Sequence, residues 1–313
     1  MALLASAQFA VCFTSCKASS EKPVASETVS PTVDSVSADS VSAEARPAVK
    51  AQVSKSDRAL VESMLAKAAS QKKSTAGEWM LYFGKQLANI PYIGGTLDRG
   101  SEEELIVNLH ELDCTTYVEQ VAALTMCAQR GEKSFDDFCE HLRHIRYING
   151  DIEYAKRQHY FTVWIDDNVK EGIVTDIQGP NPPFSAVQTV NVNWMTTHQS
   201  SYKMLSAHPE WLSGIRELEQ SVNGRKWRYI PKDKIYNTSL MRQTIHDGDI
   251  IVILTNKKGL DTTHIGLASW HADGLHLLNA SAIHKKVIDE PMTLRTYMSK
   301  HPVQIGIRVC RMK

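Results

Sequence analysis

One cysteine stands where a protein can make a thiol reactive. Asp113 is a residue type that begins helices, because its carboxylate accepts the free backbone N–H groups of a first turn. Apolar residues then recur at helical spacing, at Tyr117, Val118, Val121 and Leu124. Cys114 would therefore occupy the first position of a helix, where the helix dipole favours the thiolate. The alternative is a buried structural cysteine, since free cysteine is among the most buried residue types.

A base and an orienting group follow about 150 residues later. In the strand predicted to begin at His264, the side chains of His264, Gly266 and Ala268 share one face. Asp273-Gly274 indicates a hairpin turn, and an even loop length would put Asn279 on the same face as His264. An asparagine there can fix the tautomer of the imidazole. The three residues have the types of a thiol nucleophile, its base and its orienter, although a lone histidine at a strand end is often structural.

The remaining pattern predicts how these residues are held. Helical spacing predicts helices that begin near residue 56 and that cover 79–87 and 134–148, and the helical stretch 195–222 is interpreted as a small insertion. Strands are predicted over 250–255, 264–270, 275–281 and 303–309. Helices followed by antiparallel strands indicate an α+β fold, with the nucleophile-bearing helix packed on an antiparallel sheet.

The N-terminal residues differ from the rest of the chain. Residues 1–16 form an uncharged, mostly apolar run that is too short to span a bilayer and that ends in Phe13-Thr14-Ser15-Cys16, which is similar to a bacterial lipobox. We interpret it as a lipoprotein-type signal peptide with Cys16 as the lipidated residue. No Lys or Arg precedes the apolar run, as a signal peptide would normally have. Two alternatives therefore stay open: a misassigned start codon, or a protein that is not exported. Residues 17–55 are rich in Ser, Ala, Val, Pro and Glu and predict a disordered tether to a single catalytic domain over 56–313.

Composition and spacing argue against several other classes of protein. The chain has 35 basic and 35 acidic residues, so nothing indicates an electrostatic nucleic-acid footprint. The six cysteines form no CxxC pair, and Cys127 and Cys139 fall on apolar helical stretches typical of a core. A zinc hydrolase is a further alternative, but there is no HExxH motif, and His141 with His144 is more simply a polar helix face. We expect neither a metal nor a cofactor.

The stretch from Tyr154 to Trp164 is too rich in Arg, His, Tyr and Trp for an ordinary core strand. It is either a surface loop held by its aromatic residues or one wall of a binding cleft. The candidate cleft residues in and near it are Tyr147, Arg157, His159 and Tyr160.

Several of these segments together resemble a known group of enzymes. Asp113-Cys114, His264-Ile265-Gly266-Leu267 and Asn279-Ala280-Ser281 resemble the three signatures of NlpC-type, papain-like cysteine peptidases and amidases. Pro91-Tyr92-Ile93-Gly94-Gly95 resembles their Pro-Tyr-x-x-Gly-Gly segment. More narrowly, the chain is similar to a bacterial N-acetylmuramoyl-L-alanine amidase-like branch, through Arg146-Tyr147, Arg157-Gln158-His159-Tyr160-Phe161, Gly248-Asp249-Ile250 and Gly259-Leu260-Asp261-Thr262-Thr263-His264. The resemblance covers roughly residues 78–310.

The resemblance implies a papain-like core and hydrolysis of a peptidoglycan or muropeptide amide, the bond between N-acetylmuramic acid and L-alanine. Cys114 would attack the carbonyl, His264 would transfer the proton, and Tyr92 would help to hold the oxyanion. Arg157 would suit the carboxylates of a stem peptide. A stem-peptide endopeptidase and a non-catalytic envelope binding lipoprotein stay open as alternatives. The expected location is the cell envelope, in the periplasm, with a lipid anchor in a membrane.

Overall fold

The computed structural model describes residues 49–313. The predicted signal peptide, Cys16 and residues 17–48 of the predicted tether lie outside the described residues. The folded part begins earlier than expected, because strand β1 (Ala51–Val53) pairs in parallel with β2 (Leu105–Val107). Helix α1 (Lys55–Ala68) follows directly, capped by Ser54. The last residues of the expected tether therefore belong to the folded part.

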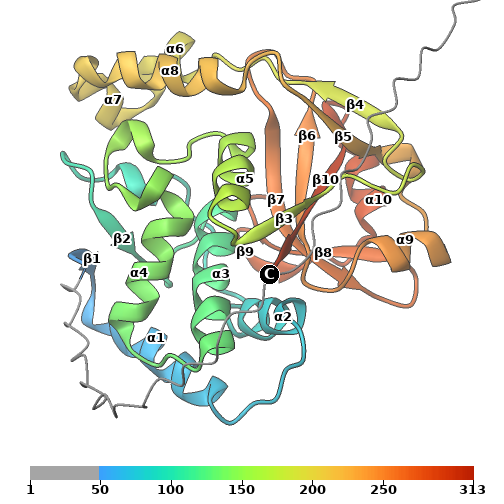
Figure 1. Cartoon of the computed structure of the whole chain (residues 1–313), viewed down its shortest axis with the longest axis horizontal. Helices are drawn as coiled ribbons and strands as arrows, with labels where there is room; N and C mark the ends of the chain where they lie inside the picture. Colours follow the sequence, from blue (N-terminus) through green and yellow to red (C-terminus); the bar gives the residue numbers. More distant parts are fainter. Residues whose placement is uncertain (1–48) are drawn as a thin grey trace, which may run out of the picture. The chain divides into compact units, whose positions relative to one another are not determined.

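An eight-stranded antiparallel sheet forms the framework of the fold. Its order is β4-β5-β10-β6-β7-β8-β9, and β3 pairs with β10 (Figure 1). The strands are β3 (Val174–Ile177), β4 (Ala186–Thr189), β5 (Lys226–Pro231), β6 (Ile250–Thr255), β7 (Thr262–Trp270), β8 (Leu275–Ser281), β9 (Lys286–Asp289) and β10 (Gln304–Met312). The predicted bounds of β6 and β8 are confirmed.

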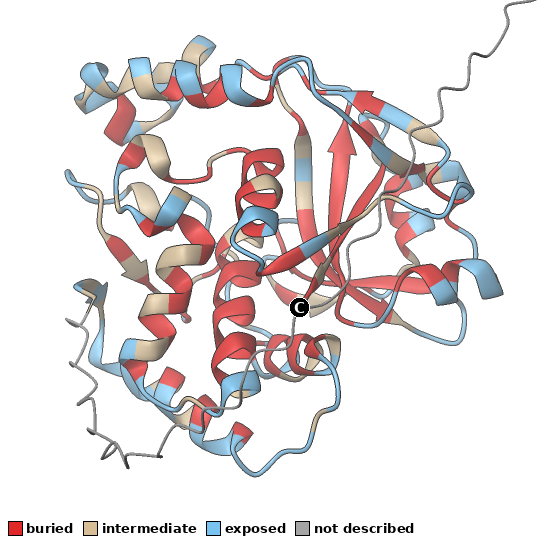
Figure 2. Ribbon diagram, viewed as in Figure 1, coloured by how far each residue is buried: buried red, intermediate tan, exposed pale blue. Residues whose placement is uncertain are grey.

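Helices cover both faces of the sheet. Alternate β6 residues Ile250, Val252 and Leu254 pack with α1, α2 (Ala76–Gln86), α3 (Cys114–Arg130) and α4 (Phe135–Arg146). Ile251 and Ile253 pack on the other face with α9 (Ser239–Thr244) and α10 (Leu294–Ser299). Burial on both faces explains why β6 is an unbroken apolar run rather than an alternating one (Figure 2). The predicted α+β class, with the cysteine-bearing helix packed on an antiparallel sheet, is confirmed.

Helix α3 is the central helix of the helical layer. The four apolar residues of its predicted stripe are fully buried. The burial extends around the helix, because Glu119 on another side is also buried and accepts a hydrogen bond from Arg146 at 2.7 Å. Glu119 on α3 and Arg146 on α4 thus form an ion pair that is nearly inaccessible to water, and this pair connects the two helices.

The predicted insertion is helical but broken into short pieces. It contains α6 (Trp194–Thr197), α7 (Lys203–Ala207) and α8 (Leu212–Val222), and it has its own apolar cluster that includes Met195, Leu205 and Ile215. The predicted aromatic stretch, Tyr154 to Trp164, runs into a helix, because its last four residues begin α5 (Phe161–Lys170). Short 3-10 helices cover Thr96–Asp98, Ile148–Gly150, Tyr154–Lys156, Gln199–Ser201, Pro209–Trp211 and Lys232–Lys234. Within residues 49–313, none of the helices has the length and apolar character needed to cross a bilayer.

Candidate active site

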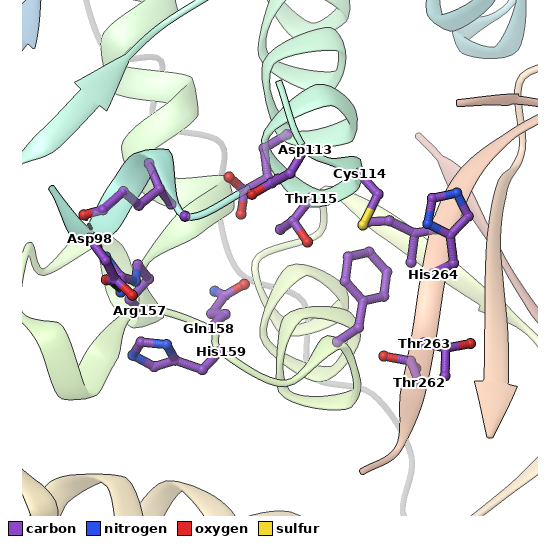
Figure 3. A pocket seen from close by; sticks show the side chains of 15 residues that line it. Asp98, Asp113, Cys114, Thr115, Arg157, Gln158, His159, Thr262, Thr263 and His264 are labelled. Atoms are coloured by element: carbon purple, nitrogen blue, oxygen red, sulfur yellow. Dashed lines mark hydrogen bonds and ion pairs between the residues drawn. The ribbon is translucent and has the colours of Figure 1, made fainter. Parts of the chain in front are cut away.

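Cys114 and His264 line the same pocket. The cavity has a volume of about 250 Å³ and lies between the beginning of α3, the beginning of β7 and the segment before α5. Figure 3 shows the Cys114 Sγ directed toward the His264 ring, with Arg157 and His159 on the opposite wall. The predicted nucleophile and base, 150 residues apart in sequence, are therefore neighbours in the fold.

The beginning of α3 is built as the sequence predicted. Asp113 accepts a hydrogen bond from the Thr116 backbone N–H at 2.8 Å, and the Thr116 hydroxyl accepts one from the Asp113 N–H at 3.0 Å. This reciprocal capping satisfies two backbone groups and places Cys114 at the first helical position. The cysteine stays partly exposed, on the pocket side.

The expected shift toward a thiolate is not what the surroundings of Cys114 favour. Burial raises the pKa of the Cys114 thiol to about 12, and the nearby Asp113 carboxylate acts in the same direction. Polar contacts from the Ile265 backbone and the Thr115 hydroxyl lower that pKa by less. The thiol therefore keeps its proton at neutral pH, and its activation requires a base.

His264 is held in the state that such a base needs. The loop between β7 and β8 is four residues long, so its length is even, and His264 Nε2 lies 2.8 Å from Asn279 Oδ1. The Asn279 amide N–H₂ donates to the Leu277 carbonyl at 2.9 Å, which sets the amide orientation, so the Oδ1 atom must accept from Nε2–H. Burial lowers the pKa of His264. The neutral ring thus keeps its Nδ1 lone pair free for the thiol proton.

Two features of β7 determine where His264 points. A β-bulge leaves Thr263 without a partner, because Ile253 pairs with His264 whereas Leu254 pairs with Thr262. Bulges commonly redirect a side chain beside an active site. Gly266 is also required, since a Cβ atom there would lie 2.8 Å from the Asn279 Cβ. The backbone at Gly266 is therefore in close contact with the orienting asparagine.

Asp261 connects two walls of the pocket, and sequence reasoning did not assign it a role. The buried carboxylate accepts from the Thr162 backbone N–H at 2.8 Å, in the first turn of α5, and from the Thr262 N–H at 2.8 Å. It therefore caps α5 from the beginning of β7. The Asp261-Thr262-Thr263-His264 run was the available signal, but the recipient helix lies 99 residues away in sequence.

The structure does not support the expected role of Arg157 as a carboxylate receptor. Its guanidinium is buried, forms an ion pair with Asp98 and donates to Glu103 at 3.1 Å. The Tyr147 hydroxyl donates to the same Glu103 carboxylate at 2.7 Å. Because two carboxylates already match its charge, Arg157 holds the segment around residues 98–103 in place. Tyr147 is fully buried behind the pocket and is not among its lining residues.

Of the other two predicted cleft residues, His159 lies in the pocket and Tyr160 does not. His159 lines the pocket, and its Nε2–H donates to the Tyr154 carbonyl at 2.8 Å. Burial lowers the pKa of His159 well below its usual value, so this ring is neutral. Tyr160 is buried and joins the inserted helices instead, since its hydroxyl donates to Glu219 at 2.7 Å and accepts from the Met195 N–H at 3.0 Å.

Tyr92 approaches Cys114 through backbone pairing. A parallel bridge joins Tyr92 to Leu112, with the Ile93 N–H donating to the Leu112 carbonyl at 3.0 Å. Burial raises the pKa of Tyr92 to about 12, with smaller contributions in the same direction from Cys114 and Asp113. The phenol therefore stays protonated beside the thiol, although it is not one of the pocket-lining residues.

These observations define an α+β protein whose pocket brings together a thiol and a neutral imidazole, with a buried amide that orients the imidazole. The model of the AmiA-like family, described as N-acetylmuramoyl-L-alanine amidase-like, matches residues 82–307. The chain belongs to this family.

The chain is also similar to several solved structures. The chain is 36% identical to an N-acetylmuramoyl-L-alanine amidase from Bacteroides uniformis ATCC 8492, with a TM-score of 0.71, covering 76% of this chain and 99% of that one. A Bacteroides fragilis protein described as a candidate xylanase is 35% identical, with a TM-score of 0.69, covering 74% and 100%. A Legionella pneumophila protein is 22% identical, with a TM-score of 0.63. The match covers 82% of this chain and 93% of that one, and it shows the fold alone. No curated protein matches the chain significantly.

The broader prediction of membership in the NlpC-type, papain-like superfamily was wrong. The matching family is the AmiA-like one, which has a distinct fold, and the papain-like core is not confirmed. Only the narrower amidase-like resemblance agrees with the match. The reason is that a cysteine at a helix start, a histidine on a strand and an asparagine on the next strand describe a local constellation. Unrelated folds can present the same constellation, so it does not specify a fold.

Proposed function

We propose that this protein hydrolyses the amide between N-acetylmuramic acid and L-alanine in peptidoglycan or in muropeptides, with Cys114 as the nucleophile. The observation that carries the proposal is the hydrogen bond of 2.8 Å between His264 Nε2 and Asn279, in a pocket shared with Cys114. It leaves the second ring nitrogen free to accept the thiol proton. Family membership supports the amidase class, and the amidase from Bacteroides uniformis supports this particular bond.

The protonation states suggest how the reaction proceeds. Because thiol and imidazole are both neutral at rest, His264 Nδ1 takes the Cys114 proton as Sγ attacks the lactyl carbonyl carbon. The imidazolium then protonates the alanine nitrogen, the C–N bond breaks, and a thioester remains. Water attacks the thioester while His264 accepts its proton, and the lactyl carboxylate leaves with the thiol restored.

The developing oxyanion needs hydrogen-bond donors. The Cys114 backbone N–H is at the first turn of α3, where helix N–H groups lack carbonyl partners. The Tyr92 hydroxyl is a second candidate donor, because its pKa of about 12 keeps it protonated through the reaction. Together they take the role that the sequence assigned to Tyr92.

The charges in the pocket favour cleavage near the sugar over cleavage inside the stem peptide. The Arg157 guanidinium is matched by two carboxylates, and the neutral His159 supplies no positive charge. Asp113 adds a further negative charge beside Cys114. A lactyl amide beside an uncharged sugar fits these surroundings better than a bond flanked by the carboxylates of the stem.

A second candidate function comes from the Bacteroides fragilis relative described as a candidate xylanase. A glycosidase needs two available carboxyl groups on either side of the scissile bond. Among the described lining residues, Asp98 is paired with Arg157, Asp113 caps α3 and Glu119 is paired with Arg146. Each carboxylate already has a structural partner, which argues against glycosidase chemistry in this pocket.

Digestion of purified muropeptides, followed by mass spectrometry, tests the proposal. We expect the wild-type protein to release intact stem peptide and the Cys114→Ala variant to release none. Shortened stems would indicate the endopeptidase instead. Binding of muropeptides without any cleavage by the wild-type protein would indicate an envelope binding lipoprotein, and equal cleavage by both proteins would refute a role for Cys114.

Location in the cell envelope is a separate proposal that rests on the sequence of residues 1–16. A lipid on Cys16 would anchor the catalytic domain to a membrane through the tether. Fractionation of cells that express the full chain or its Cys16→Ala variant tests this. We expect the full chain in the membrane fraction and the variant outside it, and equal distribution of the two would contradict the anchor.

A further inference from the structure

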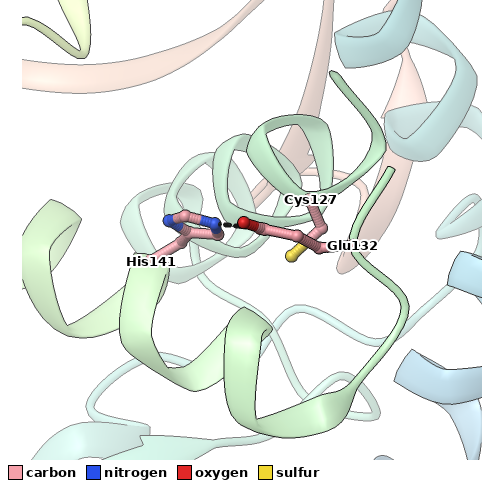
Figure 4. Close-up of side chains that lie close together, drawn as sticks. All are labelled: Cys127, Glu132 and His141. Carbon is pink, nitrogen blue, oxygen red and sulfur yellow. Dashed lines mark hydrogen bonds and ion pairs between the residues drawn. The ribbon is translucent and has the colours of Figure 1, made fainter. Parts of the chain in front are cut away.

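A second cluster of reactive side chains lies near the other end of α3. The Cys127 Sγ, a Glu132 carboxylate oxygen and a His141 ring nitrogen all lie within 4.8 Å of one another (Figure 4). Cys127 is in the last turns of α3, Glu132 is in the connecting loop and His141 is on α4. We propose that this cluster is a zinc-binding site, separate from the hydrolytic pocket.

The donor atoms suit zinc in type and spacing. Zinc accepts thiolate sulfur, imidazole nitrogen and carboxylate oxygen at about 2.0–2.3 Å, which puts neighbouring donors of a tetrahedral site roughly 3.3–3.8 Å apart. His141 Nε2 now lies 2.5 Å from Glu132 Oε2. A shift of these side chains by about an ångström would admit the ion between them.

The end of α3 holds the ligands in place. Gly131, at a φ of 70°, turns the chain back on the helix, and the Glu132 backbone N–H then donates to the Cys127 carbonyl at 2.9 Å. This C-terminal cap returns the Glu132 side chain to the level of Cys127. The approach of two ligands is thus a consequence of backbone geometry and does not depend on flexible side chains alone.

Burial leaves one direction open for the ion. Cys127 is fully buried and the His141 side chain is 9% exposed, whereas the Glu132 side chain is 30% exposed. The exposed side provides an entry path and a fourth position for water. The helical position of His141 had suggested a solvent-exposed polar face. The structure shows instead that His141 is buried.

Charge also favours an ion here. A divalent cation next to the Glu132 carboxylate would compensate its negative charge and that of a Cys127 thiolate. Without the ion, His141 and Glu132 form a hydrogen bond of 2.5 Å beside the Cys127 thiol.

The proposed site is remote from hydrolysis. Cys127 is 13 residues beyond Cys114 on the same helix, which is roughly 20 Å along its axis. A zinc ion here would fasten α3 to α4 and would not touch the substrate. Its presence is therefore independent of the proposed amidase activity.

Cobalt substitution gives a test that does not depend on activity. Thiolate ligation of Co²⁺ produces a sulfur-to-metal charge-transfer band in the near ultraviolet. Among the described residues, the other cluster able to hold an ion, His271, Asp273 and His276, has no sulfur and cannot produce this band. The experiment uses the full chain with Cys114→Ala as the parent, so that the pocket thiol does not contribute.

We expect the parent to show the band at one equivalent of Co²⁺ and to lose it when Zn²⁺ is added. Cys127→Ser and His141→Gln should each weaken Zn²⁺ binding at least 10-fold in equilibrium dialysis, and Cys127→Ser should abolish the band. Cys139→Ser, a buried cysteine outside the cluster, is the matched control and should keep both. His141→Gln keeps the test valid if Cys127→Ser does not fold. No band in the parent, or an undiminished band in Cys127→Ser, would overturn the proposal.

Discussion

Two cysteines on the same helix show how little the residue type alone decides. Cys114 opens α3, is partly exposed and faces a neutral imidazole whose other nitrogen is bound to an amide. Cys127, near the end of α3, is fully buried, and the imidazole beside it is already bound to the Glu132 carboxylate. The first histidine is free to take a proton, whereas the second is held by a carboxylate. The partner of the imidazole therefore distinguishes the proposed nucleophile site from the proposed metal site.

The pKa directions add to this contrast. Burial raises the pKa of both thiols, so neither is a thiolate on its own. What differs is access to a substrate and to a base. The position at a helix N-terminus, which first suggested activation of Cys114, contributes by leaving the cysteine at the pocket rather than by ionising it.

The largest effect is expected when the pocket thiol is removed, which tests whether Cys114 differs in function from the buried cysteines. Cys114→Ala should lower the rate of muropeptide hydrolysis by about 10³-fold or more, because no other group can form the thioester. Cys139→Ser is the control and should retain activity. The measurement is release of intact stem peptide over time. Residual activity within 10-fold of wild type would contradict the assignment of Cys114.

Arg157 tests whether the pocket wall binds substrate or supports the fold. Arg157→Met leaves the carboxylates of Asp98 and Glu103 without their cation, and should lower the free energy of unfolding by about 3–5 kcal/mol. Thermal and urea unfolding measure this. Lys226→Met, an exposed residue on β5, is the control. Unchanged stability with a raised KM would restore the role of Arg157 as a receptor for substrate carboxylates.

The pH profile tests the state of His264. The rate requires neutral His264, whose pKa lies below its ordinary value of 6.5, so kcat/KM should fall only below about pH 6.5. No second limb is expected before the thiol pKa of about 12. Activity that fell with rising pH through neutrality would contradict a neutral resting pair.

Substitutions of Asn279 should move that acid limb in opposite directions. Asn279→Asp puts a carboxylate beside the imidazolium, which raises the pKa of His264 and moves the limb to higher pH. Asn279→Ala removes a hydrogen bond that raises this pKa, so the limb moves lower. Both variants should lose about 10- to 100-fold in kcat through poorer orientation of the ring. A loss of rate with an unmoved limb would indicate a structural role only.

The smallest effect is expected from removal of the proposed zinc. EDTA should leave hydrolysis unchanged and lower the Tm of the zinc-loaded protein by a few degrees, because an ion at about 100 times its Kd stabilises the folded state by roughly 2.7 kcal/mol. Calorimetry and the muropeptide assay on the same sample separate the two outcomes. Loss of hydrolysis with EDTA would contradict the separation of a metal-independent reaction at Cys114 from a zinc site at Cys127.

Local features were predictable because short-range physics determines them. Asp113 caps α3 through neighbours three residues away, and β6 and β8 have the bounds that their apolar runs indicated. The even hairpin loop brought Asn279 to the face of His264, since side chains alternate along a strand. These local patterns predicted the helix start at Cys114 and the pairing of His264 with Asn279, whereas the tertiary structure brings Cys114 to the same pocket as His264.

Elements whose partners lie far away in the chain were missed. The start of α5 falls in the stretch interpreted as a loop or cleft wall. Its own N-terminal residue provides no side-chain cap that would have indicated a helix, and the cap comes from Asp261. The wider superfamily was misassigned for a related reason, since motifs at three positions describe a site and leave the surrounding fold open.

The sequence alone predicted the helix that begins at Cys114, the α+β class and the pairing of His264 with Asn279, because each follows from spacing along one helix or one hairpin. Only the tertiary structure decided which charges are available. It paired Arg157 with Asp98 and Glu103, more than 50 residues away, and buried His141 against Glu132 and Cys127. The physical reason is that the chemistry of an ionisable group depends on its burial and its nearest charges, and these are set by packing between distant segments.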